Sequence, residues 1–271
     1  MPQYRLTTKM AAKLKITNLQ KPPNKALPFY DDWVIDLDIF NRKEVAAKLK
    51  PYPKYKDSGI EWLGDVPEGW TIKKLKFVGD SIIGLTYSPD DVTDGSFGTL
   101  VLRSTNIQND KISLHENVFV NKIIPPKLMT KCGDILICAR NGSRSLVGKN
   151  AMMDATSSGL TFGAFTAVYR SYGVNNKYLY WVFNSSLFDC HSGSFLTTTI
   201  NQLTTGNINS FETPLPSYQQ QTTIANYLDT QTAKIDKLIE NYQKLIELSK
   251  EKRTALITAA VTGKIDVREC V

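Results

Sequence analysis

The loop 139–150 is dense in side chains that can donate hydrogen bonds, and it contains no acidic residue. Arginine can pair bidentately with guanine and asparagine with adenine, while serine and lysine side chains can hold phosphate oxygens. A solvated basic loop without a ligand is an equally good interpretation of this segment when it is taken alone. Its five candidates for contact with DNA are Arg140, Asn141, Ser143, Arg144 and Lys149.

Two further polar clusters stand near the ends of predicted elements. The first follows a predicted strand that ends at Leu102, and the second lies within Thr197–Gln202. Clusters of this kind are usually ordinary loops. The six further candidates for DNA contact in them are Arg103, Ser104, Asn106, Thr198, Asn201 and Gln202.

Residues for hydrolytic or nuclease chemistry do not occur in the spacing that such chemistry requires. His115 and His191 are the only histidines, and in a strand Cys190 and His191 would point to opposite faces, which disfavours a catalytic dyad. The glycines of loop 139–150 are separated by five residues, where a phosphate-binding P-loop needs four. Pro89–Asp90 could begin a nuclease motif, but none of the 26 acidic residues is followed two positions later by lysine. The sequence predicts a binding protein with no catalytic residue, no metal site and no cofactor of its own.

The candidate DNA-contacting side chains must be positioned by the region between Thr71 and Pro216. Short apolar runs rich in β-branched residues are separated there by Gly, Asn and Asp, which predicts a mixed α/β globular domain. The segment Asn175–Asn184 is predicted to be a helix capped by Asn175 or Asn176. The predicted strands are Lys74–Val78, Ser81–Leu85, Thr99–Leu102, Asp134–Ala139 and Ala164–Tyr169.

A long helix is predicted from Ser217 to Val261, because this stretch contains no glycine and no proline. Ser217 and Gln220 form a capping box at its start, and Gly263 is placed as its C-terminal glycine. At 1.5 Å per residue such a helix reaches roughly 65 Å, so it cannot pack along its whole length on one small domain.

Apolar residues in this helix recur at a 3.5-residue spacing, which is typical of coiled coils. Ile239 and Ile246 widen the apolar stripe, which favours packing against more than one helix or a kink near Asp229. Polar residues interrupt the pattern at Gln231, Ser249 and Lys252. The residues predicted to face a second copy or another partner are Ile224, Leu228, Ile235, Leu238, Tyr242, Leu245 and Leu256.

The net charge of +7 is concentrated at the N-terminus of the chain. Residues 1–56 hold 12 Lys and Arg against 5 Asp and Glu, while residues 57–271 hold 21 of each. We expect residues 1–50 to form a basic arm followed by a short helix near Trp33. The four cysteines show no Cys-x-x-Cys pair and no apolar run approaches a membrane span, so a cytoplasmic protein without disulfides, zinc or a membrane segment is predicted.

Three long segments resemble the specificity subunits of type I restriction-modification enzymes. Tyr55–Trp70 is similar to the family's lead-in to a target-recognition domain. Pro214–Asp229 and Ala255–Arg268 are similar to its conserved helical region. At Ser217 and Gln219–Gln221 the sequence departs from the further proline and the Glu-Gln pair that are usual in the family.

The resemblance implies a protein that recognises double-stranded DNA and directs adenine methylation, and cleavage, by partner subunits. Methyltransferase subunits would dock on the conserved helices, and a motor-nuclease subunit would join them. S-adenosylmethionine, magnesium and ATP would belong to those partners.

The usual family member has two recognition domains and two helical regions, whereas one of each is found here. A half-length subunit of this kind predicts a homodimer joined through antiparallel long helices, with an interrupted palindromic DNA target. The predicted fold class is α+β, with a recognition domain over 51–216 followed by a helical region over 217–271. Two other classes remain open: a coiled-coil adaptor whose α/β domain binds a protein, and a stand-alone nuclease.

Overall fold

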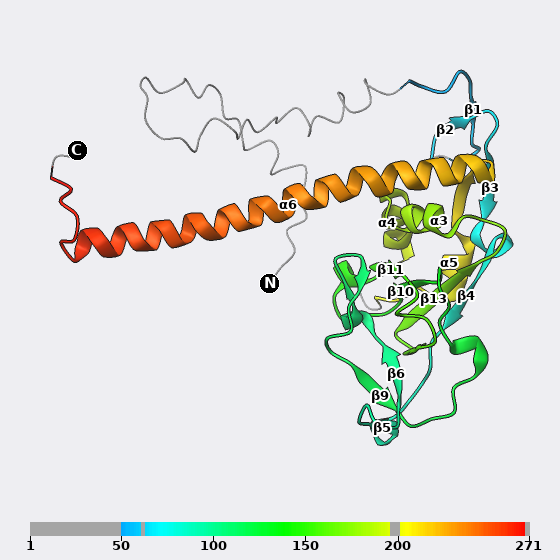
Figure 1. The fold of residues 1–271 in the computed structure, drawn as a ribbon. Coiled ribbons are helices and arrows are strands. Elements are labelled where there is room, and N and C mark those ends of the chain that lie inside the picture. Colours follow the sequence, from blue (N-terminus) through cyan, green and yellow to red (C-terminus); the bar gives the residue numbers. More distant parts are fainter. Residues whose placement is uncertain (1–49, 61–62, 196–200, 269–271) are drawn as a thin grey trace. The chain divides into compact units, whose positions relative to one another are not determined.

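The computed structural model describes residues 50–60, 63–195 and 201–268 of the chain. The basic arm and the short helix expected within 1–50 lie, except for Lys50, outside the described residues. The predicted fold class is confirmed, because a mixed α+β domain is followed by a single long helix, α6 (Figure 1).

A four-stranded antiparallel sheet, in the order β11-β10-β13-β4, forms the middle layer of the domain. Every residue of its strand β10 is buried. Successive side chains of a strand point to opposite faces, so Ile135 and Ile137 join one apolar cluster while Leu136 and Cys138 join another. A strand buried on both faces must be apolar throughout, which explains the run Ile-Leu-Ile-Cys. The strands are β4 (Gly79–Ile83), β10 (Ile135–Cys138), β11 (Asn150–Met152) and β13 (Thr166–Ser171).

Three short helices supply the side chains that cover one face of this sheet. The rings of Tyr169, Phe183, Phe188 and Phe211 follow one another there, with centroid separations of 5.3, 4.8 and 5.4 Å. The helix predicted over Asn175–Asn184 is confirmed, and Asn175 caps it by accepting from two backbone amides. The helices are α3 (Asn176–Phe183), α4 (Ser186–Phe195) and α5 (Thr205–Ser210).

A second four-stranded sheet, in the order β12-β6-β9-β5, packs through its apolar residues against the other face. Its strand β12 is parallel to β6, and its other pairs are antiparallel. A hairpin of β7 (Ile107–Gln108) and β8 (Lys111–Ile112) lies beside β11. The strands of the second sheet are β5 (Val92–Thr93), β6 (Thr99–Leu102), β9 (Val118–Val120) and β12 (Thr161–Phe162). Short 3-10 turns lie at η3 (Pro89–Asp91), η4 (Ser104–Asn106), η5 (Pro126–Leu128) and η6 (Arg144–Leu146).

The strand predicted over Lys74–Val78 is wrong. The extended strand β3 (Thr71–Lys74) ends where that prediction begins, and a 3-10 turn, η2 (Leu75–Phe77), follows it. The turn forms because the Leu75 amide donates to the Phe211 carbonyl at 2.9 Å while its side chain is fully buried. Two further strand pairs are antiparallel. They join β3 with β14 (Glu212–Leu215) and β1 (Tyr55–Asp57) with β2 (Asp65–Pro67).

The long helix α6 spans Tyr218–Val261, with the predicted Ser217–Gln220 capping box at its start. Gly263 adopts a φ of +67° just beyond its end, as expected of a C-terminal glycine. The helix continues without interruption past Asp229, where the sequence pattern allows for a kink. Within the described ranges, no helix is both long and apolar enough to cross a membrane.

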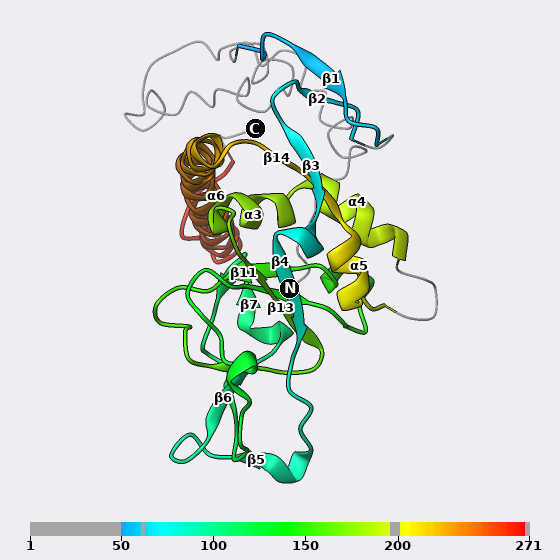
Figure 2. The same cartoon turned by 90° about the vertical axis from the view of Figure 1, so that its right-hand side faces the viewer.

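The first turns of α6 are fixed to the domain through α3 (Figures 1 and 2). The Asn175 amide donates to the buried Gln221 side chain at 2.9 Å. Asp229 accepts from the Trp181 indole at 2.9 Å and from the Lys177 ammonium at 2.7 Å. The direction in which α6 leaves the domain is therefore set by polar contacts as well as by apolar packing.

Candidate nucleic-acid interface

The polar loop that follows β10 is closed at its base by backbone hydrogen bonds. The Gly148 amide donates to Cys138 at 2.9 Å, and the Cys138 amide donates to Lys149 at 2.8 Å. The neck of the loop needs the φ of +89° at Gly148, a conformation that favours glycine. Residues 139–147 are thus presented from the end of a buried strand and do not hang from a free linker.

The structure brings the loop together with the segment 201–203. The Leu203 amide donates to the Ala139 carbonyl at 2.7 Å, and Arg140 pairs with Gln202 in an antiparallel bridge. The Asn201 side chain donates to the Gly142 carbonyl at 3.1 Å. Thr198, the remaining candidate from this cluster, lies outside the described residues.

The cluster that follows β6 also meets the loop. The Asn141 side chain donates to the Ser104 hydroxyl at 3.4 Å, which joins positions 37 residues apart in sequence. Arg103 is half-buried, and one of its terminal nitrogens donates to the Glu116 carbonyl at 3.3 Å. All three polar clusters named from the sequence therefore contribute to one surface.

Asn106 does not belong to this surface, and its inclusion as a DNA-contacting residue is corrected here. Its side chain is fully buried, accepts from the Arg103 amide at 2.9 Å and donates to the Ser113 carbonyl at 2.9 Å. Both polar atoms of its amide are thus used inside the fold, where Asn106 closes the turn after β6.

The positive charge of the surface comes from side chains of different exposure. Arg140 and Arg144 are exposed, whereas Lys149 is half-buried. Ser143 is exposed beside them, and its amide donates to the Asn141 side chain at 2.9 Å. The loop therefore offers guanidinium, hydroxyl and amide groups from a short stretch of backbone.

Cys138 lies beneath this loop with its thiol buried. Burial raises the pKa of the Cys138 thiol, and the positive charge of Lys149 and hydrogen bonds with Ser104 and Asn141 oppose that rise. The thiol donates to the Arg140 carbonyl at a sulfur–oxygen distance of 3.7 Å. A protonated, buried thiol is part of the support of the loop and is no nucleophile.

Sequence reasoning missed one member of this surface, Phe165. Its ring is 62% exposed, and the Arg140 guanidinium lies over it, 5.3 Å from the ring centroid. The Phe165 carbonyl accepts from the amides of Ala139 and Arg140 at 3.0 and 2.9 Å. The predicted strand Ala164–Tyr169 includes Phe165, but β13 begins only at Thr166, which leaves Phe165 in the turn before it. The signal in the sequence that could have marked this turn is Gly163, because glycine often interrupts a strand at a turn.

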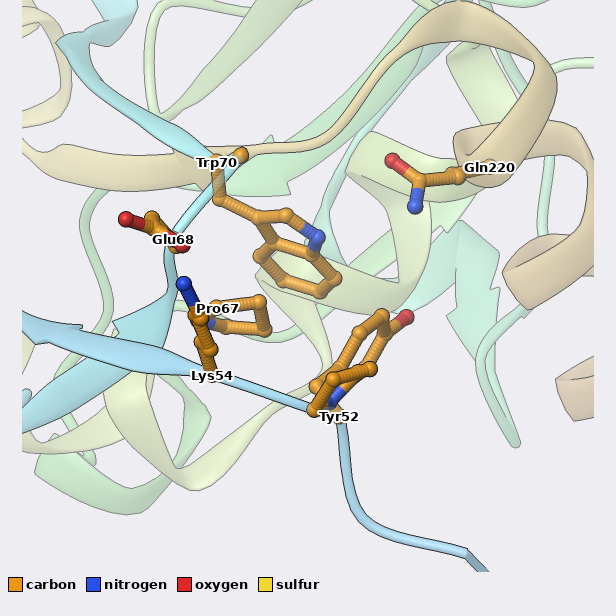
Figure 3. Close-up of a pocket in the computed structure, with 8 residues that line it drawn as sticks. Tyr52, Lys54, Pro67, Glu68, Trp70 and Gln220 are labelled. Atoms are coloured by element: carbon orange, nitrogen blue, oxygen red, sulfur yellow. The ribbon is translucent and has the colours of Figure 1, made fainter.

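A shallow pocket of about 240 Å³ lies where the segments 52–54 and 67–70 meet the first turn of α6 (Figure 3). Tyr52 and Trp70 meet edge to face in its wall, with centroids 5.7 Å apart, and Gln220 faces them from the helix. Half of its lining residues are aromatic or proline, and Lys54 and Glu68 are the charged ones. This pocket does not gather the hydrogen-bond donors that the loop surface gathers. Among the described residues, no group of three or more His, Cys, Asp or Glu side chains could hold a metal ion.

The apolar residues predicted to face a partner along α6 differ in exposure and fall into three groups. Ile224 is packed against the core of its own domain, so its place in the partner-facing set is corrected. Leu228, Leu238 and Tyr242 are half-buried. The others are exposed, at 44% for Ile235, 45% for Leu245 and 58% for Leu256. Further exposed apolar side chains on the distal part of the helix are Ile239, Ile246, Leu248, Ile257 and Val261.

Curated relatives of the chain are specificity subunits of type I restriction enzymes. The EcoKI specificity subunit of Escherichia coli (strain K12) and the StySPI specificity subunit of Salmonella potsdam are each 29% identical over 207 residues. Each alignment covers 74% of this chain and 44% of the relative. The MjaVIII specificity subunit of Methanocaldococcus jannaschii is 23% identical over 269 residues, which cover 92% of this chain and 60% of the relative. The chain thus spans about half the length of the curated relatives it matches.

Two solved structures share the fold of this chain. A chain from a study of complex assembly and conformational transition of the type I R-M system superposes with a TM-score of 0.62 at 18% identity, covering 80% of this chain and 50% of that one. The HsdS subunit from Thermoanaerobacter tengcongensis gives a TM-score of 0.51 at 18% identity, covering 68% and 41%. The family model of the type I restriction modification DNA specificity domain matches residues 67–250, and the chain therefore belongs to that family.

Proposed function

We propose that the chain is the DNA-recognition subunit of a type I restriction-modification complex. The observation that carries this proposal is the meeting of three polar clusters, separated in sequence, on one surface at the end of β10. Because the backbone of this surface is hydrogen-bonded to the end of a buried strand, the positions from which its donors project are fixed before DNA arrives. Fixed donors are what base-specific recognition requires, since specificity depends on hydrogen bonds to base edges at defined places.

The side chains of this surface have different proposed roles. The exposed guanidinium groups of Arg140 and Arg144 suit guanine edges or phosphates, and the Gln202 amide suits adenine. Ser104 and Asn141 are half-buried and bonded to one another, so they hold the surface together as well as offering polar groups. The remaining members of the proposed interface are Arg103, Ser143, Lys149 and Asn201.

The long helix has a separate proposed role in assembly. Its first turns dock on the recognition domain, proposed as residues 51–216, and its distal part carries exposed apolar side chains. An exposed apolar stripe of this length suits the packing of other helices. We propose that it pairs with a second copy of the chain and receives methyltransferase subunits, which modify adenine; a motor-nuclease subunit completes the complex.

Mapping of methylated adenines across the genome, with and without the gene for this chain, tests the proposal. We expect one interrupted palindromic site to lose methylation in the deletion and to regain it on complementation. Complementation with an Arg140→Ala, Arg144→Ala double variant should fail, while a Lys127→Ala, Lys131→Ala variant removes equal charge from an exposed part of the recognition domain outside the proposed interface and serves as the control. Loss of no methylated site in the deletion would contradict the proposal.

The exposed stripe on α6 also favours a second candidate, an adaptor that assembles proteins and does not bind DNA. The two candidates differ in their response to salt. Binding to DNA phosphates weakens steeply as salt rises because counterions are released, whereas apolar assembly tolerates salt. Retention on duplex DNA that disappears between low and moderate salt supports the first candidate, and no retention at low salt supports the adaptor.

A further inference from the structure

Phe165 is an exposed ring on a rigid support. The turn beneath it is closed by the Gly163 carbonyl, which accepts from the Thr166 amide at 2.8 Å and from the Thr166 hydroxyl at 2.7 Å. The Ala164 amide donates to the Leu85 carbonyl at 2.9 Å. Thr166 and Gly163 are buried, so the ring projects from a turn that the core holds in place.

The turn is also fixed from behind by a close backbone approach. A Cβ atom at Gly84 would lie 2.3 Å from the Gly163 carbonyl oxygen, so only glycine lets the end of β4 approach this turn. Hydrogen bonds within the turn and the close approach of Gly84 behind it thus both fix the backbone of the turn. The position of the Phe165 ring does not depend on an accidental loop conformation.

Arg140 and Phe165 form a paired unit. The Arg140 guanidinium lies over the ring, and the Arg140 amide donates to the Phe165 carbonyl at 2.9 Å. The ring attracts the guanidinium charge but offers no oxygen acceptor, so this contact places no carbonyl or carboxylate on the N–H donors of Arg140. The pairing restrains the side chain of Arg140 without using its hydrogen-bonding capacity.

An exposed apolar ring beside a guanidinium matches the chemistry of one dinucleotide in the major groove. Guanine presents O6 and N7, which accept from arginine, and thymine presents a 5-methyl group, which accepts apolar contact. A phosphate would use the guanidinium but would gain nothing from the ring. The backbone of Gln202 is bridged to that of Arg140, so Gln202 lies beside this pair and adds an amide group to the same surface.

We propose that Phe165 determines specificity by contacting the 5-methyl group of a thymine that neighbours a guanine bound by Arg140. This inference rests on the proposed function and adds to it a base step in the target. The two residues act as a pair, in which Phe165 both orients Arg140 and contacts DNA itself. Each half-site of the target should therefore contain a thymine and a guanine in adjacent base pairs.

The first test is the target itself, as given by the methylation map. A mapped half-site in which no thymine and guanine occupy adjacent base pairs overturns the inference while the proposed function stands. Absence of any methylated site dependent on the gene would remove the proposed function as well. The two failures are therefore distinguishable.

The second test measures binding of the full chain, with its methyltransferase partner, to duplexes of the mapped target. Replacing thymine by deoxyuridine removes only the methyl group and should weaken wild-type binding roughly fourfold, as expected for one buried methyl-sized group. The Phe165→Ala variant should bind the thymine duplex more weakly and should show no further loss on the deoxyuridine duplex. Replacing guanine by 7-deazaguanine should weaken the wild type and should leave Arg140→Ala unaffected.

Controls separate this contact from other roles of the ring. Phe165→Leu keeps an apolar side chain and should retain part of the preference for thymine over deoxyuridine. If Phe165→Ala keeps the full thymine preference of the wild type, the methyl contact is excluded. If the variant loses more affinity for the single strands of the target than for the duplex, the ring stacks on an unpaired base, and the inference is overturned.

Discussion

At the scale of single residues, Arg140 and Arg144 provide exposed positive charge at the proposed DNA interface. Replacing both by alanine is expected to weaken binding to the target duplex by roughly tenfold or more, since one good bidentate contact with a base contributes about 1–3 kcal/mol. Where one of these arginines contacts a phosphate, its replacement should also make the fall of log affinity with log salt concentration shallower, by about 0.9 in slope. Fluorescence anisotropy at several salt concentrations measures both quantities. The Lys127→Ala, Lys131→Ala variant should match the wild type, and equal losses in the two double variants would contradict the assignment.

Asp154 gives a prediction that concerns pH. Hydrogen bonds from Thr156 and Ser157 lower the pKa of Asp154 from 3.8 to about 2. A carboxylate with a depressed pKa contributes stability that is present above its ordinary pKa and is lost as the pH falls through the folded value. The wild type should therefore lose more stability between pH 4 and pH 2 than Asp154→Asn, whose side-chain oxygen can still accept but does not titrate.

Urea unfolding midpoints at pH 5, 3 and 2 provide the measurement for Asp154. Other carboxylates titrate equally in both proteins, so the difference between their pH profiles isolates this side chain. Identical pH profiles for wild type and variant would show that ionisation of Asp154 makes no contribution to the free energy of unfolding.

At the scale of elements, the success of sequence-based prediction depends on how local the determining contacts are. The caps of α3 and α6 were predicted correctly because Asn175 and Ser217 bond to amides two or three residues away. The turn at Leu75 was missed because its partner, Phe211, is 136 positions away in sequence. Strand pairing and the ends of short strands depend on such distant partners, which single-sequence patterns do not identify.

The same distinction applies to the candidate site. The polar clusters were recognisable from composition, but their meeting depends on contacts such as Asn141 with Ser104, which only the sheet order determines. Asn106 was misassigned because a polar residue after a strand gives no sign of whether it faces solvent or the core. Phe165 was missed because an apolar residue within a predicted strand is usually taken as core.

The ion pair between Asp134 and Arg170 connects strand β13 to the start of β10. Arg170 donates to the two carboxylate oxygens at 2.9 and 2.7 Å, and the Asp134 side chain is 3% exposed. Asp134→Ala leaves a largely buried guanidinium without its partner and is expected to lower the free energy of unfolding by about 3 kcal/mol. Urea denaturation measures the loss. Asp90→Ala, at an exposed turn, is the control, and a loss below 1 kcal/mol for Asp134→Ala would contradict this role.

Asp229 is expected to control the docking of α6 on α3. Asp229→Ala removes the acceptor of the Trp181 indole and the partner of Lys177, and should cost about 1 kcal/mol. Hydrogen exchange should rise in α3 and in the first turns of α6, where the contacts are lost. Glu251→Ala, on the exposed part of the same helix, should change neither exchange nor stability, and unchanged exchange in Asp229→Ala would show that apolar packing alone fixes the helix.

At the scale of the whole molecule, the exposed apolar residues of α6 bear on how two recognition surfaces could be held together in a dimer. Only Gln221 and Ala225 are buried in this 44-residue helix, and both lie in its first turns. A helix of this length spans roughly 66 Å, so most of it extends past the contacts that dock it. If two copies pair along their helices, two recognition surfaces are held at a fixed separation, and the spacer of the DNA target follows from that separation.

This arrangement predicts that acidic substitutions on the distal stripe separate the copies. Ile239→Glu and Ile246→Glu place a charge at positions that are 49% and 53% exposed in the single chain and are buried in the proposed dimer. Light scattering should give twice the 30.4 kDa chain mass for the wild type and 30.4 kDa for the double variant. Ile123→Glu, at an apolar position 94% exposed within the recognition domain, is the matched control and should remain dimeric. Each monomer keeps its recognition surface, so the double variant should still bind an isolated half-site but should lose its preference for the full palindrome. A wild-type chain that stays monomeric, both alone and with its methyltransferase subunit, would contradict the dimer.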